Sequence, residues 1–382
     1  MFLNMVQAIN AALKAEMLRD ERVVVLGEDV GVNGGVFRVT EGLLKEFGPE
    51  RVMDTPLDEG GIIGFAIGMA LYGLKPVAEI QFAGFFPDAF EQITTSLAKM
   101  RWMTGGQFGA PVVIRVPSGG GIRGGPWHSQ SPEAYFTHTA GLKVVAPCGP
   151  YEAKGLLISA IRDEDPVIFL EFKRLYRAFR EEVPEEDYTI PLGKARIARE
   201  GQDVSMFAYG AMLRASLEAA EQAASQGINV EVVDLRTLLP LDTETILASV
   251  EKTGRAVIVH EAPKTSGVGA EVAAVIAERA LAGPIVRVAG LDAPVHFSIG
   301  DEYLPTPNRI LNAIIHATHE SQKIVTASPP PKNAQPLQPQ PSYTASGQEE
   351  LIPLRGLRRR IAEKMVRAKH TAPHVPTSIK ST

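Results

Sequence analysis

The chain has 382 residues, of which 45% are hydrophobic and 22% are charged, the proportions of an ordinary globular protein of about two domains. No apolar run reaches the eighteen residues that a membrane-spanning helix needs. The formal net charge of −5 is unevenly spread. Residues 321–382 carry ten basic and three acidic residues, whereas residues 1–320 carry 29 basic and 41 acidic residues. The acidic character of residues 1–320 argues against nucleic-acid binding as the main function.

Residues 1 to about 180 alternate short apolar runs with helix-like stretches, which predicts a parallel sheet covered by helices. The predicted strands are 22–26, 74–82, 111–116, 142–146 and 167–170, and the predicted helices are 61–72, 88–103 and 151–162. Gly61, Gly64 and Gly68 each cost about 1 kcal/mol relative to alanine in a helix. We therefore expect them to permit close approach of a neighbouring helix or a ligand.

A polar stretch near 181–192 separates a second α/β unit. Its predicted strands are 204–209, 228–235, 256–260 and 285–288, and its predicted helices are 212–226, 243–251, 269–281 and 308–316. The sequence thus predicts an α/β protein with two parallel-sheet domains, at 1–180 and 190–320.

The remaining segment has a different composition. Residues 321–350 are rich in Pro and Gln and predict a semi-extended linker. Within 351–382, Leu354, Leu357, Ile361 and Met365 recur near one face of a short basic helix.

Residues 119–124, Gly-Gly-Gly-Ile-Arg-Gly, match the pattern GxGxxG and follow a predicted strand. The next residues, Gly125, Pro126 and Trp127, do not open a helix as a dinucleotide site requires. We expect a ligand-facing loop at the carboxyl end of a strand instead. Because His128 follows this loop and no GxSxG elbow is present, acid–base chemistry is favoured for it over service to a serine nucleophile.

Asp58 and Glu59 directly precede the glycine-rich helix. Helix capping explains Asp58. It does not require Glu59, and the glycines that follow leave room for that carboxylate to meet a planar ligand.

The ordered set of these segments resembles the β subunits of the first component (E1) of 2-oxo acid dehydrogenase complexes, over roughly 1–320. The segments that carry the resemblance are 27–31, 54–64, 79–82, 128–134 (His-Ser-Gln-Ser-Pro-Glu-Ala), 141–145, 153–157 and 260–263 (His-Glu-Ala-Pro). The resemblance implies a transketolase-like fold, in which a pyrimidine-binding domain precedes the transketolase C-terminal domain.

The family's activity is thiamine-dependent oxidative decarboxylation of a 2-oxo acid, with transfer of the acyl group to the lipoyl group of the acyltransferase component (E2). The resemblance gives Glu59 the role of hydrogen-bonding the N1′ atom of thiamine diphosphate, which prepares the cofactor to lose its C2 proton. It places Glu28, Leu57, Gln81 and Phe85 at the cofactor, Phe85 by ring contact. It gives His128 a role as proton donor in acyl transfer.

The resemblance also implies a structural potassium site built largely from main-chain oxygens. Its residues would be Val112, Ala160, Ile161, Asp163 and Asp165. An acidic turn without an ion explains Asp163 and Asp165 about equally well.

No Gly-Asp-Gly segment for Mg2+ and diphosphate occurs in the chain. The resemblance therefore implies that an α subunit supplies these ligands in an α2β2 heterotetramer, which works with a lipoyl-bearing E2 core. The single cysteine, Cys148, and the absence of a basic, apolar leader favour a cytoplasmic protein.

The tail from Ile352 to Val375 resembles the first helix of an E2 acyltransferase core, without the later catalytic His-xxx-Asp-Gly segment. A remnant of a gene fusion or frameshift and a basic arm for an anionic surface are the alternatives.

Two other functions compete with the E1 reading: half of a split transketolase, and a non-catalytic scaffold. The first would use Glu59 but is not expected to carry segments 128–134 and 260–263 together. Segment 128–134 and Leu175-Tyr176-Arg177 favour branched-chain 2-oxo acids, with pyruvate as the alternative substrate.

Overall fold

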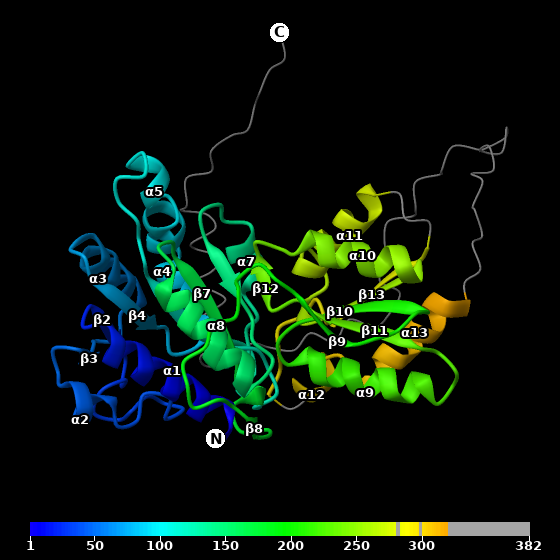
Figure 1. Ribbon diagram of the computed structural model, residues 1–382, viewed down its shortest axis with the longest axis horizontal. Coiled ribbons are helices and arrows are strands. Elements are labelled where there is room, and N and C mark those ends of the chain that lie inside the picture. The colour runs from blue at the N-terminus through cyan, green and yellow to red at the C-terminus, as the bar shows by residue number, and fades with distance from the viewer. Residues whose placement is uncertain (280–282, 298–299, 320–382) are drawn as a thin grey trace, which may run out of the picture. The chain divides into compact units, whose positions relative to one another are not determined.

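The computed structural model describes residues 1–279, 283–297 and 300–319 (Figure 1). Two sheets with mainly parallel strands organise this part of the chain, as the sequence predicts, and the α/β fold class is confirmed. No helix among the described residues is long and apolar enough to cross a membrane. The predicted linker at 321–350 and the predicted basic helix within 351–382 lie outside the described residues.

The first sheet has seven strands, and all neighbouring pairs are parallel except β12 with β6. In spatial order the strands are β12 (Thr237–Leu239), β6 (Lys143–Val145), β7 (Val167–Phe172), β5 (Val113–Ser118), β4 (Lys75–Glu79), β2 (Val23–Gly27) and β3 (Val52–Asp54). Strand β12 follows the predicted boundary near 190, so the chain of the second unit returns to complete the edge of the first sheet. The predicted strands of residues 1–180 are all present, with ends shifted by a few residues.

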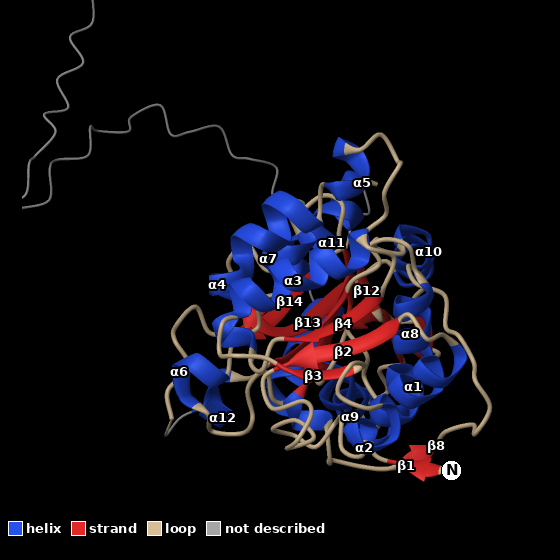
Figure 2. Cartoon of the chain, turned by 90° about the vertical axis from the view of Figure 1, so that its left-hand side faces the viewer, coloured by secondary structure: helices blue, strands red, loops and turns tan. Residues whose placement is uncertain are grey.

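Helices lie on both faces of this sheet, with α3 and α4 on the side opposite to α1 (Figure 2). The helical elements are α1 (Met5–Arg19), α2 (Leu43–Phe47), α3 (Glu59–Leu71), η1 (Ala83–Phe85), α4 (Phe86–Glu91), η2 (Gln92–Leu97), α5 (Met100–Met103), α6 (Gly125–His128), α7 (Glu133–Thr137), α8 (Pro150–Arg162) and η3 (Lys173–Leu175). Short strands β1 (Phe2–Leu3) and β8 (Glu181–Glu182) pair separately.

The predicted helix 88–103 was wrong in one respect, because the structure divides it into α4, a π-helical turn at η2 and the short α5. Thr94 Oγ1 donates to the Phe90 carbonyl at 2.8 Å, and the Ala98 N–H reaches the Ile93 carbonyl five residues back at 2.9 Å. Hydroxyl side chains that bond the preceding turn bend helices. Apolar spacing alone does not register that effect.

The second sheet has the order β14 (Ile285–Gly290), β13 (Ala256–Pro263), β10 (Val204–Ala208), β11 (Val230–Asp234) and β9 (Arg196–Arg199). The four predicted strands are confirmed and are parallel, whereas β9 was not predicted and pairs antiparallel with β11. The accompanying helices are α9 (Met212–Ala224), α10 (Thr243–Thr253), α11 (Val268–Glu278), α12 (Gly300–Tyr303) and α13 (Pro307–His319).

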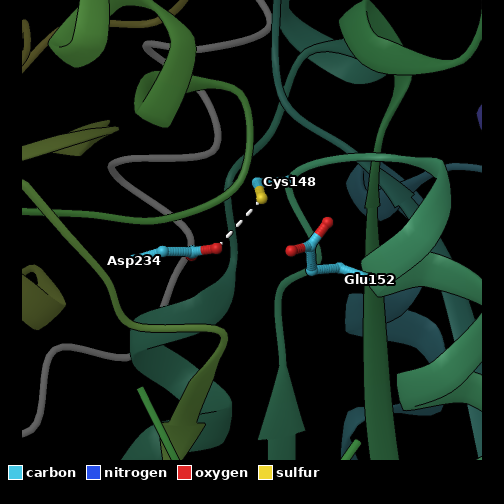
Figure 3. Close-up of side chains that lie close together, drawn as sticks. All are labelled: Cys148, Glu152 and Asp234. Atoms are coloured by element: carbon cyan, nitrogen blue, oxygen red, sulfur yellow. Dashed lines mark hydrogen bonds between the residues drawn. The ribbon is translucent and has the colours of Figure 1, made fainter. Parts of the chain in front are cut away.

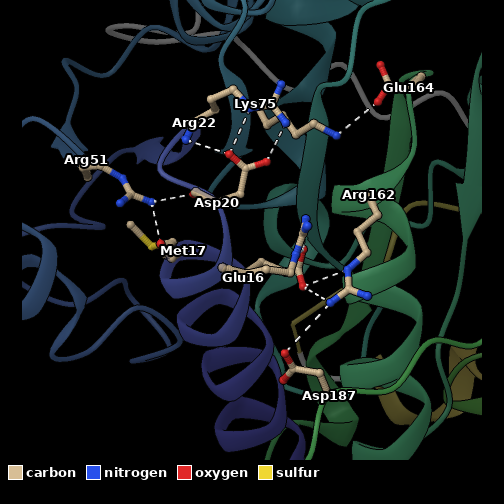
Figure 4. Close-up of polar contacts among 10 residues, drawn as sticks. Glu16, Met17, Asp20, Arg22, Arg51, Lys75, Arg162, Glu164 and Asp187 are labelled. Atoms are coloured by element: carbon tan, nitrogen blue, oxygen red, sulfur yellow. Dashed lines mark hydrogen bonds and ion pairs between the residues drawn. The ribbon is translucent and has the colours of Figure 1, made fainter.

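Polar contacts stabilise the first sheet at the amino ends of its strands (Figure 4). Arg162 at the end of α8 donates to Glu16 of α1 at 2.6 Å. Arg51 donates to the carbonyls of Met17 and Asp20 at 3.0 and 3.1 Å. Lys75, the first residue of β4, pairs with Glu164 just before β7 at 3.3 Å. The opposite, carboxyl edge is left for binding, as is usual in parallel α/β sheets.

Candidate active site

One pocket of about 440 Å³ lies at the carboxyl edge of the first sheet. It is lined by Glu28, Leu57, Glu59, Gln81, Gly84, Phe85, Pro87, Asp88 and His128. The six residues that the sequence places at the organic cofactor or in catalysis therefore line a single pocket. Gly84, Pro87 and Asp88 were not singled out, because nothing in their local sequence distinguishes them from an ordinary turn.

Strand order explains why these residues meet. Glu28 directly follows β2, Leu57 and Glu59 follow β3, and Gln81 follows β4. These three strands are neighbours and parallel, so their carboxyl ends share one edge of the sheet. Residues that are distant along the chain are thereby collected at one place.

Glu59 is the first residue of α3 and is 5% exposed. Asp58 caps this helix by accepting the Gly61 N–H at 2.8 Å, as predicted. A Cβ atom at Gly61 would lie 2.5 Å from Asp58 Oδ2, so the close approach expected at this glycine is made to the cap itself. At Gly68 a Cβ would meet no atom of the described chain within 4 Å, so no helix of this chain makes the close approach expected there.

Glu28 and Glu59 form a pair of acids in the pocket. Burial first, and then the negative charge of Glu59, raise the pKa of Glu28 to about 6. Oε1 of Glu28 is buried and has no hydrogen-bond partner among the described residues. No described donor reaches the Glu59 carboxylate either. Unpaired buried acceptors are uncommon in folded proteins, so these oxygens are suited to a ligand.

A buried ion-pair network supports the floor of the pocket. Arg115 of β5 donates to Glu171 at 2.6 Å and to Glu79 at 2.5 Å, and the Tyr176 hydroxyl donates to Glu171 at 2.6 Å. These bonds join β4, β5 and β7, and their two acids are the last residue of β4 and the next-to-last residue of β7. Gln81, two residues after Glu79, is thereby placed by the sheet, and its Nε2 lies 3.5 Å from Asp29 Oδ2.

Residues 119–124 form a loop directly after β5, as expected, and His128 is the last residue of the four-residue helix α6, which begins at Gly125. Helix α6 is far shorter than a dinucleotide-binding helix. A Cβ at Gly84 would lie 1.7 Å from the Trp127 carbonyl oxygen, so α6 packs directly on the backbone that carries Phe85. Any side chain at position 84 would clash with the Trp127 backbone.

The His128 ring is held by two phenylalanines and one carbonyl. It meets Phe82 and Phe85 edge-on, with centroid distances of 4.6 and 5.5 Å. Its Nδ1 lies 3.2 Å from the Gly124 carbonyl, which can only accept. Nδ1 therefore carries a proton, and Nε2 is the atom available for proton exchange.

The five residues expected around potassium also come together, but at the amino ends of the strands. The Val112 carbonyl accepts the Val167 N–H at 3.0 Å, and the Ala160 carbonyl accepts the Asp163 N–H at 3.3 Å near Ile161 at the end of α8. Lys143 Nζ lies 2.7 Å from both Asp163 oxygens, and Arg101 pairs with Asp165. Any ion here would depend on main-chain oxygens, because these carboxylates already have cationic partners.

A second buried cluster, at Cys148, Glu152 and Asp234, was not foreseen (Figure 3). The Cys148 thiol donates to Asp234 Oδ2 at 3.0 Å. Arg196 and Arg236 each form an ion pair with Glu152 at 3.0 Å. Burial, followed by the Asp234 charge, raises the pKa of the thiol well above its usual value. The cluster is thus an arginine-neutralised contact between the two sheets and holds no thiolate for metal binding or nucleophilic attack.

Comparison with known proteins agrees with this fold. The family model of the transketolase pyrimidine-binding domain matches residues 2–178, and that of the transketolase C-terminal domain matches residues 193–310. A solved structure described as a split-gene transketolase, an inactive β4 tetramer, has a TM-score of 0.69 at 25% identity and covers 83% of this chain and 98% of that chain. The fold and the pocket at its strand ends thus define a transketolase-like protein.

More similar proteins narrow the assignment. The pyruvate dehydrogenase E1 component subunit β of Staphylococcus epidermidis is 54% identical over 313 residues, which cover 81% of this chain and 96% of that protein. The protein of the same description from Staphylococcus aureus is also 54% identical over 313 residues. The chain belongs to the E1 β subunits of 2-oxo acid dehydrogenase complexes, an oxidoreductase family.

Proposed function

We propose that this chain forms, with an α subunit, the E1 enzyme that decarboxylates a 2-oxo acid and passes the acyl group to a lipoyl group on E2. The observation that carries the proposal is the pocket in which Glu28, Glu59 and His128 meet. The two domains match the two family models. In this proposal residues 1–180 hold the pyrimidine side of the cofactor, and residues 190–320 form the transketolase C-terminal domain.

The pocket suits the aminopyrimidine of thiamine diphosphate, because it offers the unpaired buried Oε1 of Glu28, the carboxylate of Glu59 and an aromatic ring at Phe85. When bound, thiamine diphosphate supplies a carbanion-stabilising centre for loss of carbon dioxide. Glu59 holds a proton at the N1′ atom of the ring. Glu28, whose pKa is raised to about 6, lies in the same pocket, while Gln81 and Leu57 bound the ring position. His128 gives a proton from Nε2 during acyl transfer.

We propose that the α subunit completes this site. Leu57 is 81% exposed although it lines the pocket, which is expected of a side chain that a second subunit covers. Mg2+ and the diphosphate need oxygen ligands that a Gly-Asp-Gly segment usually contributes, and this chain has none. We place them on the α subunit, in an α2β2 assembly, and place potassium, if bound, at the main-chain oxygens of Val112 and Ala160.

Two substrates remain in competition. Segment 128–134 and Leu175-Tyr176-Arg177 favour branched-chain 2-oxo acids, whereas the names of the Staphylococcus relatives favour pyruvate. A methylene in an apolar pocket changes discrimination by only about 1–3 kcal/mol. The ratio of kcat/KM for pyruvate and 2-oxoisovalerate, measured on the reconstituted enzyme, decides between them.

Substitution of Glu59 by Gln tests the central role. In the α2β2 enzyme, Glu59→Gln should slow exchange of the cofactor C2 proton by about 100-fold or more, because an amide cannot hold the N1′ proton. The matched control is Glu91→Gln on the exposed side of α4, which should exchange at the wild-type rate. Wild-type exchange in Glu59→Gln would show that another group activates the cofactor.

A further inference from the structure

The segment that carries His128 is a loop closed at its base. The Gly119 N–H donates to the Gln130 carbonyl at 2.8 Å and closes a loop of residues 119–130. We call Gly119, Gly120, Gln130 and Ser131 the neck of the loop. The position of His128 depends on how this neck is held, because α6 has only four residues of its own.

A carboxylate from the second sheet contacts both sides of the neck. Glu261 of β13 is 1% exposed, and its Oε1 accepts the Ser131 hydroxyl at 3.3 Å. The backbone N–H of Gly120 also favours the charged form of this carboxylate and lowers its pKa. A Cβ at Gly119 would lie 1.8 Å from Glu261 Oε1, so the glycine is required for the acid to reach the neck.

The arrangement is costly in electrostatic terms. Burial raises the pKa of Glu261, while the positive charge of Lys173 and the bonds from Ser131 and Gly120 oppose that rise. Oε2 of Glu261 has no hydrogen-bond partner among the described residues. Apolar residues can often replace buried ion pairs without loss of stability. A purely structural role at the contact between the two sheets therefore does not require a carboxylate at position 261.

Lys173 extends the contact toward the pocket. It is buried, and its Nζ lies 5.9 Å from the centroid of the Phe82 ring, the ring that meets His128 at 4.6 Å. The contact of Glu261 with the His128 segment is therefore made through the neck, and the charge of Lys173 lies between Glu261 and the aromatic rings that meet His128 only as an electrostatic influence.

We infer that Glu261 is a positioning residue, which holds the neck of the 119–130 loop from the second domain and thereby aims His128 for acyl transfer. This inference rests on the proposed function. It accounts for segments 128–134 and 260–263 occurring together, since Ser131 in the first contacts Glu261 in the second.

A nearby contact provides a matched control. The Tyr209 hydroxyl, next to β10, donates to Glu133 Oε1 at 2.8 Å, so it too is a buried hydrogen bond between the second domain and the 128–134 segment. It does not touch the neck. Tyr209→Phe removes that bond and should weaken packing without releasing the loop.

The test compares two reactions of the reconstituted full-length enzyme with pyruvate. Glu261→Gln should slow transfer to a lipoyl domain by about 10- to 100-fold, because misplacement of a reacting group by about 1 Å has effects of that size. Decarboxylation measured with ferricyanide as electron acceptor does not use His128. The fold-loss in its rate should therefore be at least about ten times smaller than the fold-loss in the rate of transfer. Ser131→Ala should shift the ratio of the two rates in the same direction by a smaller factor, and Tyr209→Phe should leave that ratio within about twofold of wild type.

A second measurement does not depend on activity. Trypsin should cleave after Arg123, an exposed residue of the loop, faster in Glu261→Gln than in wild type or Tyr209→Phe. The Glu261→Gln variant should still fold. Burial lowers the pKa of Lys173 to about 7, so this lysine can lose its proton when the charge of Glu261 is removed.

The outcomes separate the inference from the function on which it rests. Equal loss of both rates in Glu261→Gln and Ser131→Ala, with unchanged cleavage after Arg123, overturns the role of Glu261. Full acyl transfer by His128→Ala, measured in parallel, instead overturns the proposed role of His128.

Discussion

Buried carboxylates are the residues on which both the pocket and its support depend. Glu28 and Glu59 line the pocket, Glu133 belongs to the 128–134 segment, and Glu261 contacts that segment through Ser131. Glu133 is 0% exposed, and its Oε2 has no hydrogen-bond partner among the described residues. Carboxylates in such places lower the stability of the folded state when ionised.

Glu133 therefore makes stability depend on pH. Burial is the main cause that raises its pKa to about 7, from 4.5 in the unfolded chain, and the Glu261 charge adds to the rise. The folded state thus holds the proton more tightly, so the stabilisation that this proton provides is present below pH 4.5 and is lost as pH rises through 7.

We expect Glu133→Gln to remove this dependence. The amide cannot ionise, and its oxygen can still accept the Tyr209 hydroxyl. Relative to wild type, the variant should gain about 1–3 kcal/mol of unfolding free energy at pH 8 and change little at pH 4.5. Urea denaturation at the two pH values measures this difference, and a variant equally destabilised at both would contradict the assigned pKa.

At the scale of elements, helix α3 brings Glu59 to the pocket and begins at a cap made by Asp58. Asp58→Ala should lower the unfolding free energy by about 0.5–2 kcal/mol, because an orphan N–H at the helix start loses its acceptor. Asp58→Asn should restore most of that loss, since its side-chain oxygen still accepts the Gly61 N–H. Thermal denaturation distinguishes the pair; identical Tm values for Asp58→Ala and wild type would show that the cap contributes little.

The strand ends show what sequence patterns can establish about a site. Apolar runs identify β2, β4 and β5, and polar residues after β2, β3 and β4 become neighbours because parallel strands align their carboxyl ends. The spacing of apolar residues could not predict the break in the predicted helix 88–103. It depends on hydroxyl bonds to the backbone and on packing against α3.

For the whole molecule, we expect residues after His319 to be dispensable for decarboxylation. A chain truncated after His319 keeps all described elements, so with the α subunit, thiamine diphosphate and Mg2+ it should decarboxylate 2-oxo acid at close to the full-length rate. Neither form should be active without the α subunit. A large loss on truncation would give the 321–382 tail a role in the reaction, and activity of the isolated chain would contradict the shared site.

The sequence by itself determined most of the strands and helices, the cap at Asp58 and, through the family resemblance, six of the nine residues that line the pocket. These features depend on periodicity and on short motifs, which are local. The tertiary structure alone decided that β12 joins the first sheet, that Cys148 meets Asp234, and that Glu261 reaches the neck of the His128 loop. Such contacts join segments more than 80 residues apart, and their choice depends on how whole layers pack.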